Sequence, residues 1–147
     1  MSSRDLDTLY RQVIMDHYKN PRNRGELEGD PLTVNLNNPT CGDRVQVQMK
    51  VKDGEVTEAV FTGEGCSISL ASASMMTQAV KGLSVEDALK LSDIFSDMMQ
   101  GKDYDEKTFD LEDIEALSGV TKFPARIKCA TLAWKALEQG LDVKPSS

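Results

Sequence analysis

Hydrophobic positions repeat with two different periods along this chain, and the change of period predicts the order of the structural elements. Between residues 6 and 18 the apolar side chains recur every three or four positions, which predicts an amphipathic helix ending at Asn20-Pro21. Apolar and polar residues then alternate in three runs, which predicts three strands. The alternating runs are residues 32–36, 45–51 and 56–62. Asp53-Gly54 is typical of a hairpin turn, so an antiparallel meander is expected.

The helical period returns after Gly65 and continues through the rest of the chain. Four helices are predicted there, each with a glycine near its end. They are residues 68–80 before Gly82, a helix from Ser84 to Gly101, a short helix at 111–117 ended by Gly119, and Pro124 to Gln139 before Gly140. The expected fold is α+β, a small three-stranded antiparallel sheet with helices packed on one face. One domain spanning residues 1–147 is expected, with a loose tail from about residue 141.

Charge and composition narrow the classes of function. The formal net charge of −7 opposes binding to a nucleic-acid backbone, which needs clustered Lys and Arg. No apolar run approaches the roughly 20 residues of a membrane-spanning helix. The first residues lack the apolar segment of a secretory signal, so a cytoplasmic location is expected, without nucleic-acid or membrane partners.

The three cysteines are the candidate chemistry of the chain. Cys41 falls in a turn between two predicted strands, Cys66 follows Gly63-Glu64-Gly65 at a helix start, and Cys129 lies in the first turns of the last helix. An odd number of cysteines in a reducing compartment favours metal binding, catalysis or inert buried thiols over disulfides. The three side chains could converge at one end of the sheet, although buried thiols that act as small hydrophobic residues remain the alternative.

A carboxylate accompanies the first thiol, since Asp43 lies two residues after Cys41. Three thiols and one carboxylate can form a tetrahedral zinc site, whereas the alternative role for Asp43 is to bind turn amides. Three thiolates, one carboxylate and Zn²⁺ sum to a local charge of −2, which a nearby cation would stabilise. Arg126, three residues before Cys129, is a better candidate for that cation than Lys128, which points elsewhere on a helix.

Other polar residues on apolar faces are interpreted as packing residues. His17, the single histidine, lies on the apolar side of the first helix and is expected to pack rather than to bind a metal. The serines of the second helix lack a Gly-x-Ser-x-Gly elbow, which opposes a serine nucleophile. These serines are Ser67, Ser69, Ser72 and Ser74.

The segments around the three cysteines resemble those of the IscU/NifU-like iron-sulfur assembly proteins, and the resemblance covers nearly the whole chain. The segments are Asn37-Asn38-Pro39-Thr40-Cys41-Gly42-Asp43, Gly63-Glu64-Gly65-Cys66-Ser67-Ile68-Ser69 and Phe123-Pro124-Ala125-Arg126-Ile127-Lys128-Cys129. Scaffold members of the family carry histidine where this chain has Lys128, and they contain a Leu-Pro-Pro-Val-Lys motif that is absent here. These two differences, together with an extended segment at about 83–105, make the chain similar to the SufU-type zinc-containing sulfur acceptors of Gram-positive bacteria.

The resemblance implies a zinc site of Cys41, Asp43, Cys66 and Cys129. It also implies that Cys41 accepts persulfide sulfur from a cysteine desulfurase of the SufS type and that the sulfur passes to the downstream iron-sulfur assembly machinery. Arg126 is then expected to assist ligand rearrangement, so Cys41 and Arg126 are the predicted catalytic residues. The resulting prediction is a zinc-dependent sulfurtransferase.

Two alternatives stay open at the level of sequence. The same thiols could assemble a [2Fe-2S] cluster transiently, which would make the protein a scaffold. Zinc could instead be purely structural, in an interaction module, and the number of protein ligands does not separate a structural site from a reactive one here.

Overall fold

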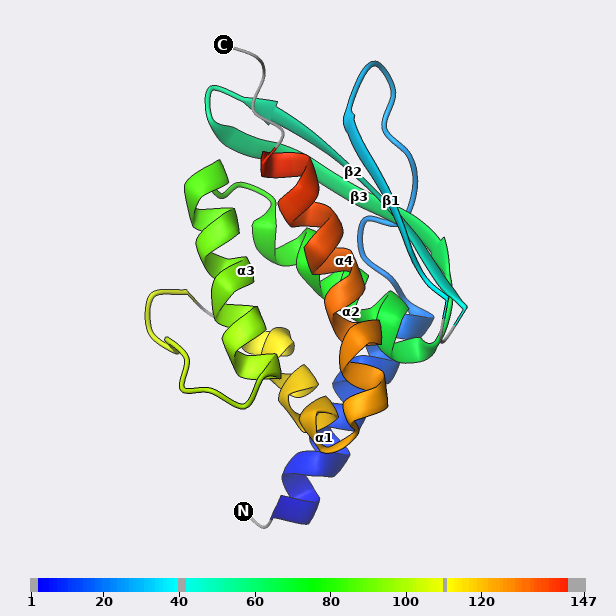
Figure 1. The fold of residues 1–147 in the computed structure, drawn as a ribbon, viewed down its shortest axis with the longest axis vertical. Helices are drawn as coiled ribbons and strands as arrows, with labels where there is room; N and C mark the ends of the chain where they lie inside the picture. Colours follow the sequence, from blue (N-terminus) through cyan, green and yellow to red (C-terminus); the bar gives the residue numbers. More distant parts are fainter. Residues whose placement is uncertain (1–2, 40–41, 110, 143–147) are drawn as a thin grey trace.

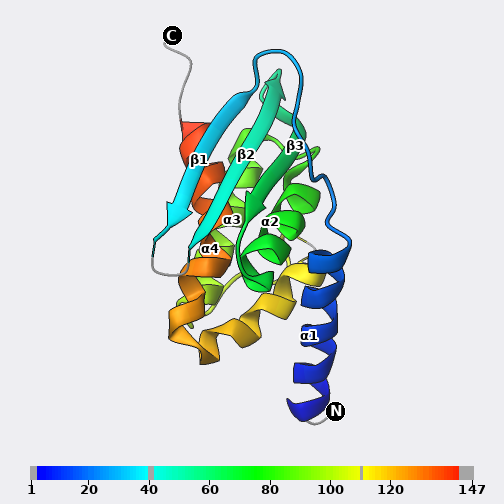
Figure 2. The ribbon, with the colours of Figure 1, turned by 90° about the vertical axis from the view of Figure 1, so that its right-hand side faces the viewer.

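The computed structural model describes residues 3–39, 42–109 and 111–142, and they form a three-stranded sheet with helices on one of its faces (Figures 1 and 2). The elements in chain order are α1 (Ser3–Lys19), β1 (Leu32–Asn38), β2 (Asp43–Lys52), β3 (Glu55–Glu64), α2 (Ser67–Val80), α3 (Val85–Met99), the 3₁₀ helix η1 (Glu112–Lys122) and α4 (Pro124–Asp142). The predicted α+β class, with its antiparallel sheet, is confirmed. Among the described residues, no helix is long and apolar enough to cross a membrane.

The sheet has the order β1-β2-β3, and both pairs of strands are antiparallel. Val45, Val47 and Met49 alternate inward along β2 and are fully buried, whereas their neighbours in sequence face outward. Asp53 and Gly54 both have positive φ, at 54° and 78°, which is the geometry of the tight turn that joins twisted strands. The strict alternation of the sequence is therefore what fixes the buried face of the sheet.

Helix α4 lies along β1 and β2, while α2 packs against β3 (Figure 2). The prediction that the last helix ends before Gly140 is wrong, because α4 continues through this glycine to Asp142. A Cβ atom at Gly140 would lie 2.4 Å from Cε of Met49 and 3.3 Å from Cγ2 of Val34. Gly140 thus permits close approach of the helix to the sheet, and it does not terminate the helix.

The segment before α4 also differs from its prediction. A short helix ending at Gly119 was expected, whereas η1 is a 3₁₀ helix of 11 residues that passes through Gly119 to Lys122. Residues of η1 bury apolar side chains in the core, and Leu117 is fully buried. Packing on neighbouring helices supports a 3₁₀ segment longer than the three or four residues that are common.

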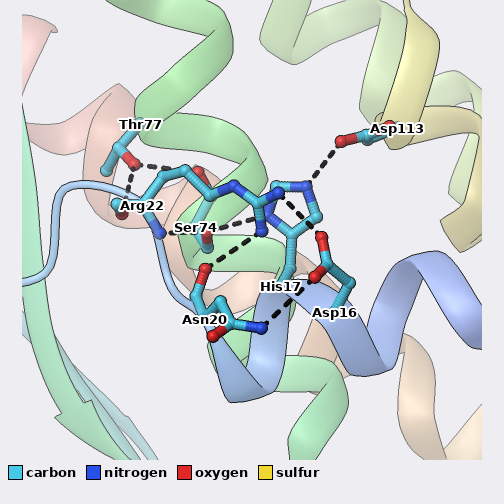
Figure 3. A network of polar contacts seen from close by, with 7 residues as sticks. All are labelled: Asp16, His17, Asn20, Arg22, Ser74, Thr77 and Asp113. Atoms are coloured by element: carbon cyan, nitrogen blue, oxygen red, sulfur yellow. Dashed lines mark hydrogen bonds and ion pairs between the residues drawn. The ribbon is translucent and has the colours of Figure 1, made fainter.

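A buried polar network holds α1 against α2 and η1 (Figure 3). His17 is fully buried; its Nδ1 lies 2.8 Å from Oγ of Ser74, and its Nε2 lies 2.6 Å from Oδ2 of Asp113. The backbone N–H of Arg22 donates to the same Ser74 hydroxyl, at 2.8 Å. Both ring nitrogens are therefore engaged in contacts within the fold, and the buried Ser74 is shielded from any substrate.

Candidate metal centre

Three predicted site residues, Asp43, Cys66 and Cys129, come from three different elements at one end of the sheet (Figure 1). Asp43 begins β2, Cys66 precedes α2, and Cys129 lies in the second turn of α4. One ligand atom from each side chain lies within 4.8 Å of the other two. Cys41, the fourth residue of the predicted ligand set, lies outside the described residues.

Contacts on the Asp43 side chain fix its position. One carboxylate oxygen, Oδ1, accepts a hydrogen bond from the backbone N–H of Cys66, at 2.9 Å. Gly65 makes room for the same oxygen, because a Cβ atom there would lie 2.4 Å from it. The start of β2 is thereby joined to the start of α2, and the absence of a side chain at position 65 brings the carboxylate close to the thiols.

The other oxygen of Asp43, Oδ2, is buried and has no hydrogen-bond partner among the residues that the structure describes. The whole residue is 0% exposed. A buried carboxylate is costly unless a positive charge or hydrogen bonds compensate it. Beside two thiols, such an oxygen fits a metal cation better than it fits an isolated acid.

Cys66 occupies the N-cap of α2, and its Sγ accepts a hydrogen bond from the backbone N–H of Ser69 at 3.4 Å. The N-terminus of a helix has a positive potential, which stabilises a thiolate there. Cys129 is fully buried in α4. Both thiols are thus placed where they can become metal ligands: one at a helix terminus, the other in the dry interior.

Arg126 precedes Cys129 by one helical turn and extends toward the thiols. A hydrogen bond with the Cys129 side chain, together with the negative charges of Cys66 and Cys129 as thiolates, raises the pKa of the Arg126 guanidinium. Lys128 is exposed on another side of α4. The structure therefore brings Arg126 to this group of side chains, as a cation that can balance its negative charge.

Two residues that the sequence analysis did not assign to the site also carry buried polar atoms without a partner in the described part of the chain. They are Asn38, at the end of β1, and Ser69, in the first turn of α2. Asn38 stands immediately before Pro39 and pairs with Asp43 across the two strands. Its place within the first cysteine segment was the available sequence signal, but strand pairing was needed to put its side chain near the carboxylate.

The donor set of two thiols and one carboxylate fits zinc. In a tetrahedral zinc site the metal lies about 2.3 Å from sulfur and 2.0–2.2 Å from oxygen, so neighbouring ligand atoms are roughly 3.3–3.8 Å apart. The ligand atoms of the three side chains are at most 4.8 Å apart, so small side-chain movements would bring them to these distances. Two thiols and a carboxylate offer three of the four positions of such a site.

A groove of about 370 Å³ runs beside the site between α1, α2 and η1. Its lining is mostly apolar and includes Ile14, Ile68, Val120 and Phe123. Phe123 is 61% exposed, so its ring presents apolar surface at one wall of the groove. Ser67, which follows Cys66 directly in the sequence, is one of the lining residues.

Comparisons with known proteins show which family the chain resembles. The family described as "NifU-like N terminal domain" matches residues 9–130. The zinc-dependent sulfurtransferase SufU of Bacillus subtilis is 69% identical over 137 residues, which cover 93% of this chain and 92% of that protein. The iron-sulfur cluster assembly scaffold protein IscU of Streptococcus pyogenes is 48% identical over 141 residues, covering 96% and 87%.

A solved structure has the same fold. It is a crystal structure of a candidate scaffold protein for iron-sulfur cluster assembly in the SUF system, from Fervidobacterium islandicum, with a TM-score of 0.83 and 32% identity. The match covers 88% of this chain and 94% of the other. The arrangement of sheet and helices that positions the site is thus shared with that protein.

Proposed function

The chain belongs to the NifU-like N-terminal domain family, and from this and the site we propose that it is a zinc-dependent sulfurtransferase of iron-sulfur cluster assembly. It accepts sulfane sulfur from the persulfide of a cysteine desulfurase of the SufS type and passes that sulfur on. The observation that carries the proposal is the fully buried Asp43 carboxylate. It brings an oxygen within 4.8 Å of the thiols of Cys66 and Cys129, and its Oδ2 has no hydrogen-bond partner among the described residues.

In this proposal Asp43, Cys66, Cys129 and Cys41 hold the zinc ion. Bound zinc keeps its thiol ligands deprotonated near neutral pH and holds them in place. Asp43 would be the hardest donor of the set on a borderline-soft metal ion, so its bond to zinc would be the one that adjusts most readily when Cys41 takes up sulfur. Arg126 supplies a positive charge to the thiolates during such an adjustment.

Sulfur transfer then proceeds as a displacement at sulfur. The thiolate of Cys41 attacks the outer sulfur of the donor persulfide, forming a new S–S bond while the S–S bond of the donor breaks. The donor cysteine leaves as a thiolate, and Cys41 becomes a persulfide. One sulfur atom moves between two thiols, and no external oxidant or reductant is needed.

The apolar groove beside the site supports docking of the sulfur donor at this face. Its lining includes Ser67, the residue after Cys66, and the exposed ring of Phe123 offers apolar surface to a protein partner. Arg11, which lines the same groove, gives it positive charge although the chain as a whole is acidic. A donor with an apolar, acidic surface around its persulfide loop would complement this face.

The proposal is tested by sulfur transfer from a persulfidated desulfurase to zinc-loaded and zinc-stripped protein. We expect transfer to the zinc-loaded form and its loss after stripping, with recovery when zinc is restored. Equal transfer to both forms would contradict a zinc-dependent reaction. Phe123→Ser serves as a docking variant, expected to raise the KM for the desulfurase while leaving zinc content unchanged.

A scaffold role is the second candidate, because the Streptococcus relative is an iron-sulfur assembly scaffold and thiolates also bind iron-sulfur clusters. This role predicts a coloured, transferable [2Fe-2S] species when iron, sulfide and a reductant are supplied without oxygen. An absence of cluster under those conditions, together with zinc-dependent sulfur transfer, would decide for the sulfurtransferase.

A further inference from the structure

Asn38, Asp43 and Ser69 each bury a side-chain polar atom that has no partner within the described part of the chain. The atoms are Nδ2 of Asn38, Oδ2 of Asp43 and Oγ of Ser69. The residues are only 7%, 0% and 1% exposed, so water does not readily satisfy them. Buried polar groups are nearly always paired in folded proteins, and three exceptions in one chain require a physical reason.

Asn38 and Asp43 are direct partners in the β1–β2 pairing, so their side chains lie on the same face of the sheet. Side chains at opposed positions have Cβ atoms about 4.5–5.5 Å apart. The unpartnered atom of Asn38 is a donor, whereas the unpartnered oxygen of Asp43 is an acceptor. An amide at this position can therefore reach the carboxylate oxygen after a small rotation.

Ser69 lies between Cys66 and Ser72 on one stripe of α2, because the three residues are three positions apart. Both ends of this stripe face the same part of α4. The thiol of Cys66 approaches that of Cys129, and the hydroxyl of Ser72 donates to the carbonyl of Ala130 at 2.5 Å. The Ser69 hydroxyl therefore faces α4 at the level of Cys129.

We propose that Asn38 and Ser69 are positioning residues of the zinc centre, with Asn38 donating a hydrogen bond to Oδ2 of Asp43 and Ser69 donating to the sulfur of Cys129. The inference deepens the proposed function, because it rests on zinc being held by these ligands. A ligating carboxylate oxygen or thiolate keeps further lone pairs for such bonds. Hydrogen bonds to metal ligands orient them and raise metal affinity, and the bound site carries a negative charge that two donors disperse.

Neither donor has a partner among the described residues, which separates this role from that of an ordinary structural side chain paired within the fold. A structural serine stabilises the fold whether or not metal is present. An unpaired buried hydroxyl destabilises the metal-free fold, so its removal is neutral or stabilising there. The same removal weakens zinc binding.

The experiment measures zinc affinity by chelator competition, with zinc alone as the probe, and the Tm of the metal-free protein. The variants are Ser69→Ala and Asn38→Leu. The control for Ser69→Ala is Ser72→Ala, because the Ser72 hydroxyl accepts a hydrogen bond from Nε1 of Trp134 at 3.1 Å. The control for Asn38→Leu is Asn37→Ala, because Asn37 is exposed on the same strand. We expect each of the two variants to lose about 10- to 100-fold in zinc affinity. Metal-free Ser69→Ala should keep or raise its Tm, whereas Ser72→Ala should lower its own.

Ser69→Thr, which keeps a hydroxyl, should restore most of the affinity lost in Ser69→Ala. Zinc affinity within twofold of the unmodified protein in Ser69→Ala would overturn the inference, as would a metal-free Tm lowered as much as in Ser72→Ala. Because Ser69→Ala removes a single heavy atom, it decides the question even if Asn38→Leu fails to fold. The binding measurement uses no desulfurase, so failure of sulfur transfer in the unmodified protein would count against the proposed function alone.

Discussion

Two polar clusters in this protein each contain buried side chains, and they differ in whether the buried polar atoms are paired. Around His17, both ring nitrogens have partners, in Ser74 and Asp113, and the network joins three elements (Figure 3). Around Asp43, by contrast, buried polar atoms of the carboxylate and of two neighbouring residues have no partner among the described residues. The first cluster is complete without a ligand, and the second is not.

This difference in pairing indicates that the His17 cluster stabilises the fold, whereas the Asp43 cluster serves the function. A satisfied buried network stabilises one arrangement of helices, because breaking it leaves polar groups unpaired. An unsatisfied cluster is destabilising in itself, and its persistence indicates that something else binds there. The comparison predicts opposite consequences for substitutions in the two clusters.

Asp43→Asn should have the largest effect on the metal centre. The amide keeps the size of the side chain and an oxygen for the Cys66 N–H, but it removes the negative charge that zinc requires. Zinc affinity should fall by more than the roughly 10- to 100-fold expected for an outer partner. The Tm of the metal-free protein should stay the same or rise, because a buried charge has been removed. If Asp43→Asn bound zinc as tightly as the unmodified protein, Asp43 would not be a zinc ligand.

His17→Ala should show the reverse pattern. The substitution leaves a cavity and separates Ser74 from Asp113, which we expect to cost about 2–4 kcal/mol of unfolding free energy. At about 2–4 °C per kcal/mol for a chain of this size, thermal unfolding should detect the loss readily. Zinc stoichiometry of the folded protein should not change. Loss of zinc from folded His17→Ala would contradict the separation of the two clusters.

Gly65→Ala should weaken zinc binding by about tenfold, as expected for a displaced ligand. The added Cβ would lie 2.4 Å from Oδ1 of Asp43, so the carboxylate has to move away from the thiols. Gly119→Ala is the matched control, since a Cβ there meets no atom within 4 Å. Chelator competition on both variants checks the prediction, and equal affinities would show that the position of Asp43 is not held by Gly65.

Arg126→Gln should slow sulfur transfer about tenfold with little effect on zinc content, because the guanidinium contacts a thiol without being a ligand. Lys128→Gln, on another side of the same helix, is its control and should transfer sulfur at the normal rate. Single-turnover kinetics with a persulfidated desulfurase measures both. Equal rates for the two variants would exclude a role for Arg126 in the transfer.

The smallest effect is expected at the surface pair near the His17 cluster, where Arg22 donates to Oδ2 of Asp16 at 2.7 Å. The hydrogen bond from Arg22 lowers the pKa of Asp16 below its usual value of 3.8. The pair therefore contributes stability above that pH, and the contribution is lost as pH falls through the lowered pKa. Asp16→Asn should lower the Tm slightly at pH 7 and not at pH 2. An equal change in Tm at pH 7 and pH 2 would show that the effect of Asp16→Asn comes from packing and not from the ion pair.

Local sequence signals predicted most of the fold because they coincide with the tertiary structure. Alternation along β2, the positive-φ turn at Asp53-Gly54 and the cap at Ser84, whose hydroxyl accepts from the N–H of Asp87, are all visible in a single segment. Gly119 and Gly140 misled the prediction, since both lie inside helices. The need for glycine at position 140 comes from Met49 and Val34, which are far away in sequence.

The candidate site likewise has features that local sequence signals predict and features that depend on tertiary contacts. The sequence placed the cysteines at element boundaries and singled out Asp43 and Arg126, and the family resemblance grouped them into one ligand set. Pairing of Asn38 with Asp43 depends on tertiary structure, as does the contact of Ser72 with α4 from which the orientation of Ser69 is inferred, so neither Asn38 nor Ser69 could be assigned from the sequence. The role of Cys41 stays a prediction, because this residue lies outside the described part of the chain.

Persulfide mapping of the zinc-loaded protein tests the central claim most directly. The protein is incubated with a SufS-type desulfurase and cysteine, persulfides are trapped by alkylation, and the modified peptides are identified by mass spectrometry. The account predicts one added sulfur on Cys41, and its loss in Cys41→Ser while Asp43, Cys66 and Cys129 still retain zinc. Sulfur found on Cys66 or Cys129 instead, or on no cysteine of the zinc-loaded protein, would contradict it.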